Sequence, residues 1–148
     1  NNSALLGLYS ALVDDLHEPY IRPQENGARG GVRMLAVTDN LGAGLMVIGE
    51  ETFENNGFSF NAHPYTDVEL DKATHTPELT AGDHTVLSLD WRMGGIGSNS
   101  CGPEPQEKYR LFLKEPASFT LVLRPYNRQA GEMMSLGRQL PAVEAENE

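Results

Sequence analysis

The chain has 148 residues, of which 39% are hydrophobic, which is enough for one globular domain with one core. Its formal net charge of −10 argues against nucleic-acid binding, which needs clustered lysine and arginine, and no apolar run approaches the roughly 20 residues of a membrane helix. The single cysteine excludes an internal disulfide and mildly favours a reducing compartment. Because residues 1–4 contain no methionine, we expect a piece of a longer or processed protein.

Alternating apolar and polar residues, punctuated by turns, predict an all-β fold with one short helix. Residues 5–16 suit a helix or, because of Gly7 and Val13, an extended strand. Further strands are predicted at 32–38, 44–49, 58–62, 85–90, 109–113 and 118–123, with turns at 39–42 and 115–117. Thr66 and Glu69 form a capping box, which predicts a short helix that ends near Thr74.

The strand pattern dissolves after Pro125. The region from Gln129 onward is rich in glycine, glutamate and small residues. We therefore expect a sandwich domain over residues 1–125 and a tail over 126–148 that is mobile or extends the edge of the domain.

The most distinctive segment is the loop at 91–103, which has the sequence WRMGGIGSNSCGP and follows a predicted strand. It carries no Lys, Asp, Glu or His after Arg92, so it suits an uncharged, hydroxyl-rich ligand or serves as a plain connection. The substrate-binding candidates are Asn99, Ser100 and Cys101. Residues 97–102 have the glycine spacing of a phosphate loop, but the lysine that must follow is absent. Cys101 has no base near it in the sequence, which disfavours a nucleophile.

Four other residues are candidate catalysts or ligands. His63 and His75 flank the predicted helix, but without ligand spacing or a cysteine partner they are interpreted as core-edge histidines, and no metal site is predicted. Glu25 is interpreted as an anchor for the amides of its turn. Neither these three residues nor Glu78 is assigned as catalytic. The sequence also has no G-x-S-x-G motif, so it does not support serine-hydrolase chemistry.

Several motifs together resemble one family. They are 7–10 (GLYS), 13–14 (VD), 19–27 (PYIRPQENG), 32–38 (VRMLAVT), 58–62 (FSFNA), 73–79 (ATHTPEL) and 93–97 (MGGIG). In order and spacing they are similar to the C-terminal domain of family 2 glycoside hydrolases that are β-galactosidases, over about residues 7–125. The resemblance implies an antiparallel β-supersandwich, galactose-mutarotase-like, of which this chain is the later part only.

The resemblance also implies a role. In that family the catalytic glutamates lie in a separate barrel, and Mg and Na are bound by other domains, so this chain is expected to have no catalytic residue, no metal and no cofactor. Retaining chemistry needs two carboxyl groups about 5 Å apart, and the sequence offers no such pair. The isolated fragment is therefore expected to be inactive.

What the family's domain contributes is one wall of the sugar pocket, where a tryptophan stacks on the sugar. Cys101 stands at that position here. The implied partners are the other domains or a large subunit of a cytoplasmic, homo-oligomeric β-galactosidase and its galactoside substrate, including lactose.

Two other hypotheses about the function remain open. A stand-alone carbohydrate-binding module would need an exposed aromatic platform, for which Trp91 and the tyrosines are candidates. A mutarotase-like epimerase would need His63, His75 and Glu78 to converge on a sheet face.

Overall fold

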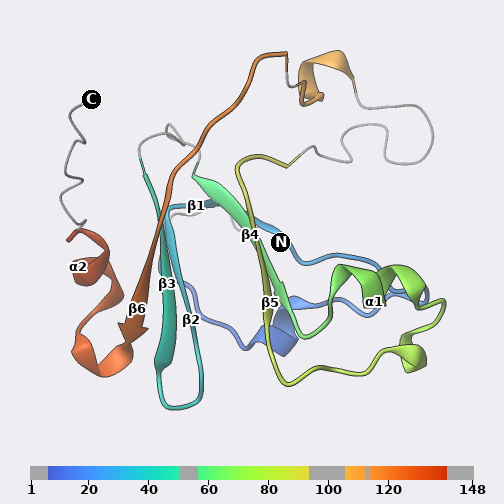
Figure 1. Ribbon diagram of the computed structural model, residues 1–148, viewed down its shortest axis with the longest axis horizontal. Coiled ribbons are helices and arrows are strands. Elements are labelled where there is room, and N and C mark those ends of the chain that lie inside the picture. The colour runs from blue at the N-terminus through green and yellow to red at the C-terminus, as the bar shows by residue number, and fades with distance from the viewer. Residues whose placement is uncertain (1–6, 51–56, 94–105, 113, 140–148) are drawn as a thin grey trace. The chain divides into compact units, whose positions relative to one another are not determined.

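The computed structural model describes residues 7–50, 57–93, 106–112 and 114–139. The chain divides into two compact units, one of residues 1–31 and 58–112 and the other of residues 32–57 and 113–148. Each unit contains one three-stranded sheet, β1–β4–β5 in the first and β2–β3–β6 in the second (Figure 1). Antiparallel strands with few short helices are the elements of an all-β sandwich, so the predicted fold class is confirmed.

The sheet of the second unit contains the predicted hairpin. Its strands are β2 (Met34–Thr38), β3 (Ala43–Gly49) and β6 (Leu121–Asn127), and β3 pairs antiparallel with both neighbours. Asp39 organises the turn, because its Oδ1 accepts from the backbone N–H of Leu41 at 2.8 Å and of Ala43 at 3.0 Å. Gly42 has φ +85°, a conformation that favours glycine.

β3 is the apolar centre of this unit. Met46 and Val47 are fully buried and Ile48 nearly so, although consecutive strand residues point to opposite faces. Both faces of the strand are therefore covered at this point. Each such side chain contributes on the order of 1.5–3 kcal/mol of hydrophobic stabilisation.

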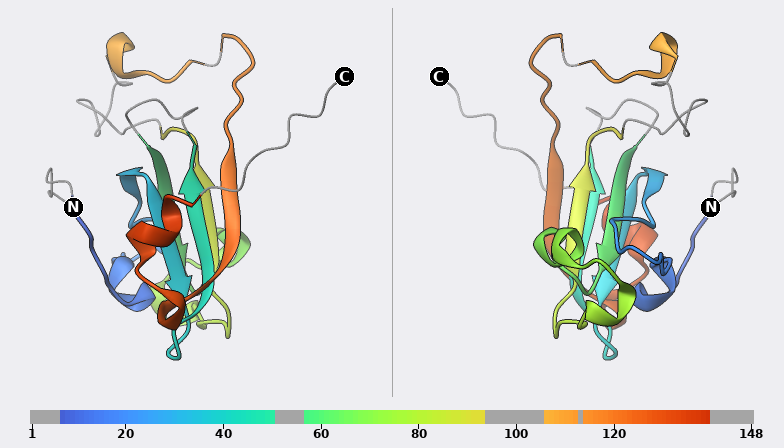
Figure 2. Two further views of the ribbon diagram at one scale, coloured as in Figure 1. Left: turned by 90° about the vertical axis from the view of Figure 1, so that its left-hand side faces the viewer. Right: turned by 90° about the vertical axis from the view of Figure 1, so that its right-hand side faces the viewer.

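One face of this sheet carries helix α2 (Met133–Gly137), which follows the short 3-10 helix η6 (Arg128–Ala130) (Figure 2). The Arg124 guanidinium of β6 donates to the carbonyls of Leu136 and Gln139 at 3.0 and 3.1 Å. A Cβ at Gly137 would lie 2.7 Å from the sulfur of Met34, so helix and sheet approach closely. The sequence pattern predicted no helix after residue 125. Strand β6 continues past that residue to Asn127. The domain boundary at residue 125 stays a prediction.

The first unit is built on β1 (Arg29–Val32), β4 (Phe58–His63) and β5 (Val86–Asp90), with β4 and β5 antiparallel. Helix α1 (Asp67–Lys72) has the predicted capping box: Thr66 accepts from the Glu69 backbone, and the Glu69 carboxylate accepts from the Thr66 backbone. Its Leu70 is buried. The strands at 58–62 and 85–90 and the capped helix are thereby confirmed.

Other predictions differ from the structure. The described part of 5–16 contains only the 3-10 helix η1 (Val13–Leu16), and the region predicted as a strand at 109–113 holds the end of the 3-10 helix η5 (Glu107–Tyr109) and no strand through residue 112. The strand predicted at 118–123 begins only at 121. Within the described ranges, no helix is long and apolar enough to cross a membrane.

Candidate functional site

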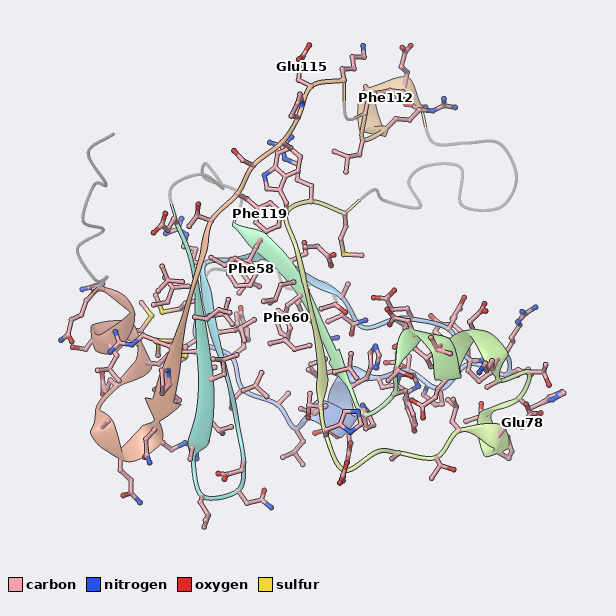
Figure 3. The ribbon with its side chains drawn as sticks, in the orientation of Figure 1. Phe58, Phe60, Glu78, Phe112, Glu115 and Phe119 are labelled. Atoms are coloured by element: carbon pink, nitrogen blue, oxygen red, sulfur yellow. The ribbon has the colours of Figure 1, made fainter. Side chains whose placement is uncertain are left out.

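The β4–β5 pair has one apolar and one polar face. Alternation puts Phe58, Phe60 and Ala62 on one side of β4, and Figure 3 shows the two phenylalanines following one another along the strand. Ser59, Asn61 and His63 take the other side. Their partners across the ladder are Asp90, Ser88 and Val86, in that order. A polar face is expected to meet water, but Asn61 and His63 are 2% and 1% exposed.

An aromatic group contacts the end of this face. The ring of His17, which directly follows η1, lies edge-on to His63 at 6.4 Å between centroids and to Tyr65 at 5.5 Å. His63 and Tyr65 are stacked at 6.4 Å. No sequence pattern singles out His17, whereas the alternation of Ser59, Asn61 and His63 is a signal that these three residues share a face.

Asn26 holds the turn that precedes β1. Its Oδ1 accepts from the Glu18 backbone N–H at 2.8 Å, and its Nδ2 donates to the carbonyls of Glu18 and Gln24 at 2.9 and 3.0 Å. Gly27 follows with φ +77°, and a Cβ there would meet the Leu16 carbonyl oxygen at 2.2 Å. The amide of Asn26 therefore anchors the turn, and not the carboxylate of Glu25 as the sequence suggested.

Glu25 instead reaches the polar face. Its Oε1 accepts from Asn61 Nδ2 at 3.3 Å, which leaves Asn61 Oδ1 buried without a hydrogen-bond partner among the described residues. Burial, and secondarily the negative charge of Glu25, raise the pKa of Asp90. The charge of Glu25 thus acts on Asp90 at this face, an arrangement that the sequence did not reveal.

His75 and Glu78 form a separate, exposed pair: His75 immediately precedes the 3-10 helix η3 (Thr76–Glu78), and Glu78 ends it, at the edge of its unit in Figure 3. Glu78 accepts from the backbone N–H and hydroxyl of Thr74, both at 2.9 Å, and lies 3.2 Å from His75 Nδ1. The backbone bond, then the hydroxyl and His75, lower the pKa of Glu78 to about 2. A carboxylate with this pKa cannot act as a general acid near neutral pH.

The three residues of the mutarotase reading therefore have different surroundings. His63 is buried against His17 and Tyr65, while His75 is two-thirds exposed and bonded to Glu78. His63 is also not a satisfied core histidine, because neither ring nitrogen has a partner in the described part of the chain. The described residues contain no group of three or more His, Cys, Asp or Glu side chains that could hold a metal.

β5 leads directly into the distinctive loop. Trp91 follows the strand half-buried, and the Arg92 guanidinium carbon lies 4.6 Å from the centre of its ring. One face of the indole is thus occupied by a cation, which weakens the case for Trp91 as an open sugar platform. The candidates Asn99, Ser100 and Cys101 lie outside the described residues.

Comparison with known proteins agrees with the motifs. The family model described as beta galactosidase small chain matches residues 1–123. This chain belongs to that family. It is 40% identical over 112 residues to a beta-galactosidase of Actinobacillus pleuropneumoniae, an alignment that covers 76% of this chain and 10% of that protein. A beta-galactosidase of Vibrio cholerae is 40% identical over 126 residues, covering 78% of this chain and 11% of that protein.

A beta-galactosidase of Staphylococcus xylosus is 38% identical over 103 residues, which are 70% of this chain and 10% of that protein. The aligned part of this chain therefore spans about a tenth of the length of the relatives it matches. It is a β-galactosidase-related domain, and the resemblance inferred from its motifs is confirmed.

Proposed function

We propose that this chain works as the C-terminal part of a family 2 β-galactosidase, a retaining glycosidase of terminal β-galactosides such as lactose. The proposal rests on the 40% identity over 112 residues between this chain and a beta-galactosidase. The aligned segment is 10% of that protein. In this proposal the rest of the enzyme supplies the carboxylate pair and the metals. This domain supplies structure and one wall of the sugar site, in a cytoplasmic homo-oligomer.

The loop after β5 is the proposed contact with substrate, through Asn99, Ser100 and Cys101. Its support is chemical: small hydroxyl and amide side chains and backbone donors, with no charged residue from 93 to 103, suit an uncharged sugar. A thiol cannot replace the stacking of an aromatic ring. Cys101 therefore implies a weaker or wider subsite for the leaving sugar.

A chimera tests the proposal. The segment of the Actinobacillus pleuropneumoniae enzyme that aligns with this chain is replaced by this chain, and hydrolysis of a chromogenic β-galactoside is measured against the same enzyme with the segment deleted. We expect activity in the chimera and none in the deletion. A folded chimera without activity would overturn the proposal. Restoring an aromatic face with Cys101→Trp should lower KM several-fold with little change in kcat.

The isolated chain is expected to be inactive. Turnover by the purified chain that vanishes in Glu25→Gln or Asp90→Asn, the carboxyl groups on the polar face of β4 and β5, would show a catalytic site within this domain and would overturn the assignment. The variant Glu78→Gln is the matched control, since its carboxylate lies on η3.

A further inference from the structure

The sheet of the second unit is apolar on both faces. One face carries α2, where Met34 lies against Gly137. The opposite face has two rows of side chains that run across the three strands, and all are apolar: Leu35, Val47 and Leu123 in one row, and Val37, Leu45 and Pro125 in the other. A sheet face that meets water is expected to carry polar side chains, so this second face needs a covering layer.

Burial stops part-way along the first row. Leu35 and Val47 are 7% and 0% exposed, whereas Leu123, which is paired directly with Val47, is 57% exposed. In the second row Leu45 is 36% exposed, and Pro125 is also exposed. The apolar face therefore extends past its covered part, and its uncovered end lies on β6.

β6 is poorly suited to extend the sheet by pairing with another strand. It is an outer strand, and among the described strands only β3 pairs with it (Figure 1). Arg128 N–H donates to the Gly42 carbonyl, and Glu50 N–H donates to the Thr120 carbonyl. These bonds mark the hydrogen-bonded pairs of the ladder, and the alternation between them turns the backbone of Pro125 away from β3, where it has no N–H to donate. A partner on this side is therefore expected to cover the face and not to add a strand.

The size of the relatives and the charge of the chain identify the occupant. The segment aligned with this chain is 10% and 11% of two beta-galactosidases, so most of such an enzyme lies outside the segment and is available to cover the face. A second copy of this chain is disfavoured, because two molecules that each carry a net charge of −10 repel one another.

We propose that Leu45, Leu123 and Pro125 form a docking surface for another part of the same β-galactosidase, which lays apolar side chains against this face of β6 and completes the covering layer. This inference rests on the proposed function, because the occupant is the remainder of that enzyme. Burial of this apolar surface helps to hold the domain in the enzyme.

Thiol labelling tests the docking surface directly. Leu123→Cys and, as a matched control, Leu41→Cys are made in the isolated chain and in the chimera with the Actinobacillus pleuropneumoniae enzyme. Leu41 is 81% exposed, in the turn between β2 and β3. Each protein reacts with N-ethylmaleimide, and mass spectrometry of its peptides follows modification at position 123 or 41 separately from that of other cysteines.

Position 123 should react at least about tenfold more slowly in the chimera than in the isolated chain, because a covered thiol reacts only after local opening. The rates at position 41 should agree within about twofold. Equal rates at position 123, or equal slowing at both positions, would overturn the proposal. Labelling of position 123 in the isolated chain that slows as its concentration rises about 100-fold would also overturn it, because the occupant would then be a second copy.

This measurement does not depend on activity. A folded but inactive chimera with position 123 protected would overturn the proposed function and support the docking surface, whereas an active chimera with position 123 reactive would do the reverse. If the chimera does not fold, Leu123→Cys in the isolated chain is labelled with and without an excess of the segment-deleted enzyme. Slowing at position 123, with none at position 41 of the control, would support the docking surface, and unchanged labelling would overturn it.

Discussion

The central strands of the two sheets, β3 and β4, are both buried but by different chemistry. β3 puts Met46 and Ile48 on one face and Val47 on the other, all apolar. β4 buries Phe58 and Ala62 on one face and two polar side chains on the other. The first arrangement only stabilises. The second costs stability, because each buried polar atom without a hydrogen-bond partner costs about 1–3 kcal/mol.

The largest expected change in the free energy of unfolding comes from truncating a core side chain of β3 or β4. It tests whether both strands are the packed centres of their units. Phe58→Ala should cost about 3–5 kcal/mol and Met46→Ala about 2–5 kcal/mol, because both leave cavities in fully buried positions. Urea unfolding measures both. Leu41→Ala, at an exposed turn position, is the control and should change stability by less than about 0.5 kcal/mol. A cost below 1 kcal/mol for either core variant would show that its strand is not the centre of a packed unit.

The next effect concerns the face of β3 that carries α2. Removal of residues 128–148 should cost about 1–3 kcal/mol, because the charged Arg124 loses both carbonyl acceptors and Met34 loses its contact with Gly137. Thermal and urea unfolding measure the loss. Arg124→Met in the full chain should reproduce part of it. An unchanged midpoint after truncation would instead support the mobile tail that the sequence predicts.

The parts of the fold that the sequence predicted are those determined locally. The hairpin at 34–49 has two apolar segments around an Asp-Asn-Leu-Gly turn, and α1 has its own capping box, so neither needs a distant partner to be recognised. The region from Tyr109 to Phe112 also has a strand-like pattern. The structure forms no strand there, because a local pattern cannot report whether another strand is available for pairing.

Helix α2 was missed for the opposite reason. It has five residues and no side-chain cap, so its support comes from Arg124 in β6, a tertiary contact. The candidate site was predictable only in part. Alternation could place Asn61 and His63 on one face, but their burial depends on His17 and Glu25, which lie 36 or more positions away in the chain.

A smaller effect probes α1, in the same unit as the polar face of β4. Thr66→Ala removes the hydroxyl that accepts from the Glu69 backbone and should cost about 1 kcal/mol. Thr66→Ser keeps this oxygen and should cost a few tenths at most. Chemical denaturation of the three proteins provides the measurement. Equal losses for both variants would mean that the methyl group, and not the cap, stabilises this end of the helix.

The smallest effect is the pH dependence at η3. The pKa of Glu78 is lowered to about 2 from an ordinary value of 4.5, so the stabilisation by its ionised form is complete above about pH 4.5 and is lost as the pH falls toward 2. Glu78→Gln should therefore be less stable than the unaltered chain at pH 7 and equally stable at pH 2. Because this group is exposed, solvent screening keeps the difference small. A difference that grows on acidification would contradict the assigned bonds.

Gly44 helps to determine the register in which β2 and β3 pair in the second unit. A Cβ at this position would lie 1.9 Å from the Val37 carbonyl oxygen and 2.8 Å from the Thr38 Cα. If β3 slid by one residue along β2, either Ala43 or Leu45 would bring a side chain into that space. The same slip would exchange the faces of Met46 and Val47. A misaligned hairpin would therefore have a steric clash at the pair of residues next to the turn, Thr38 and Gly44.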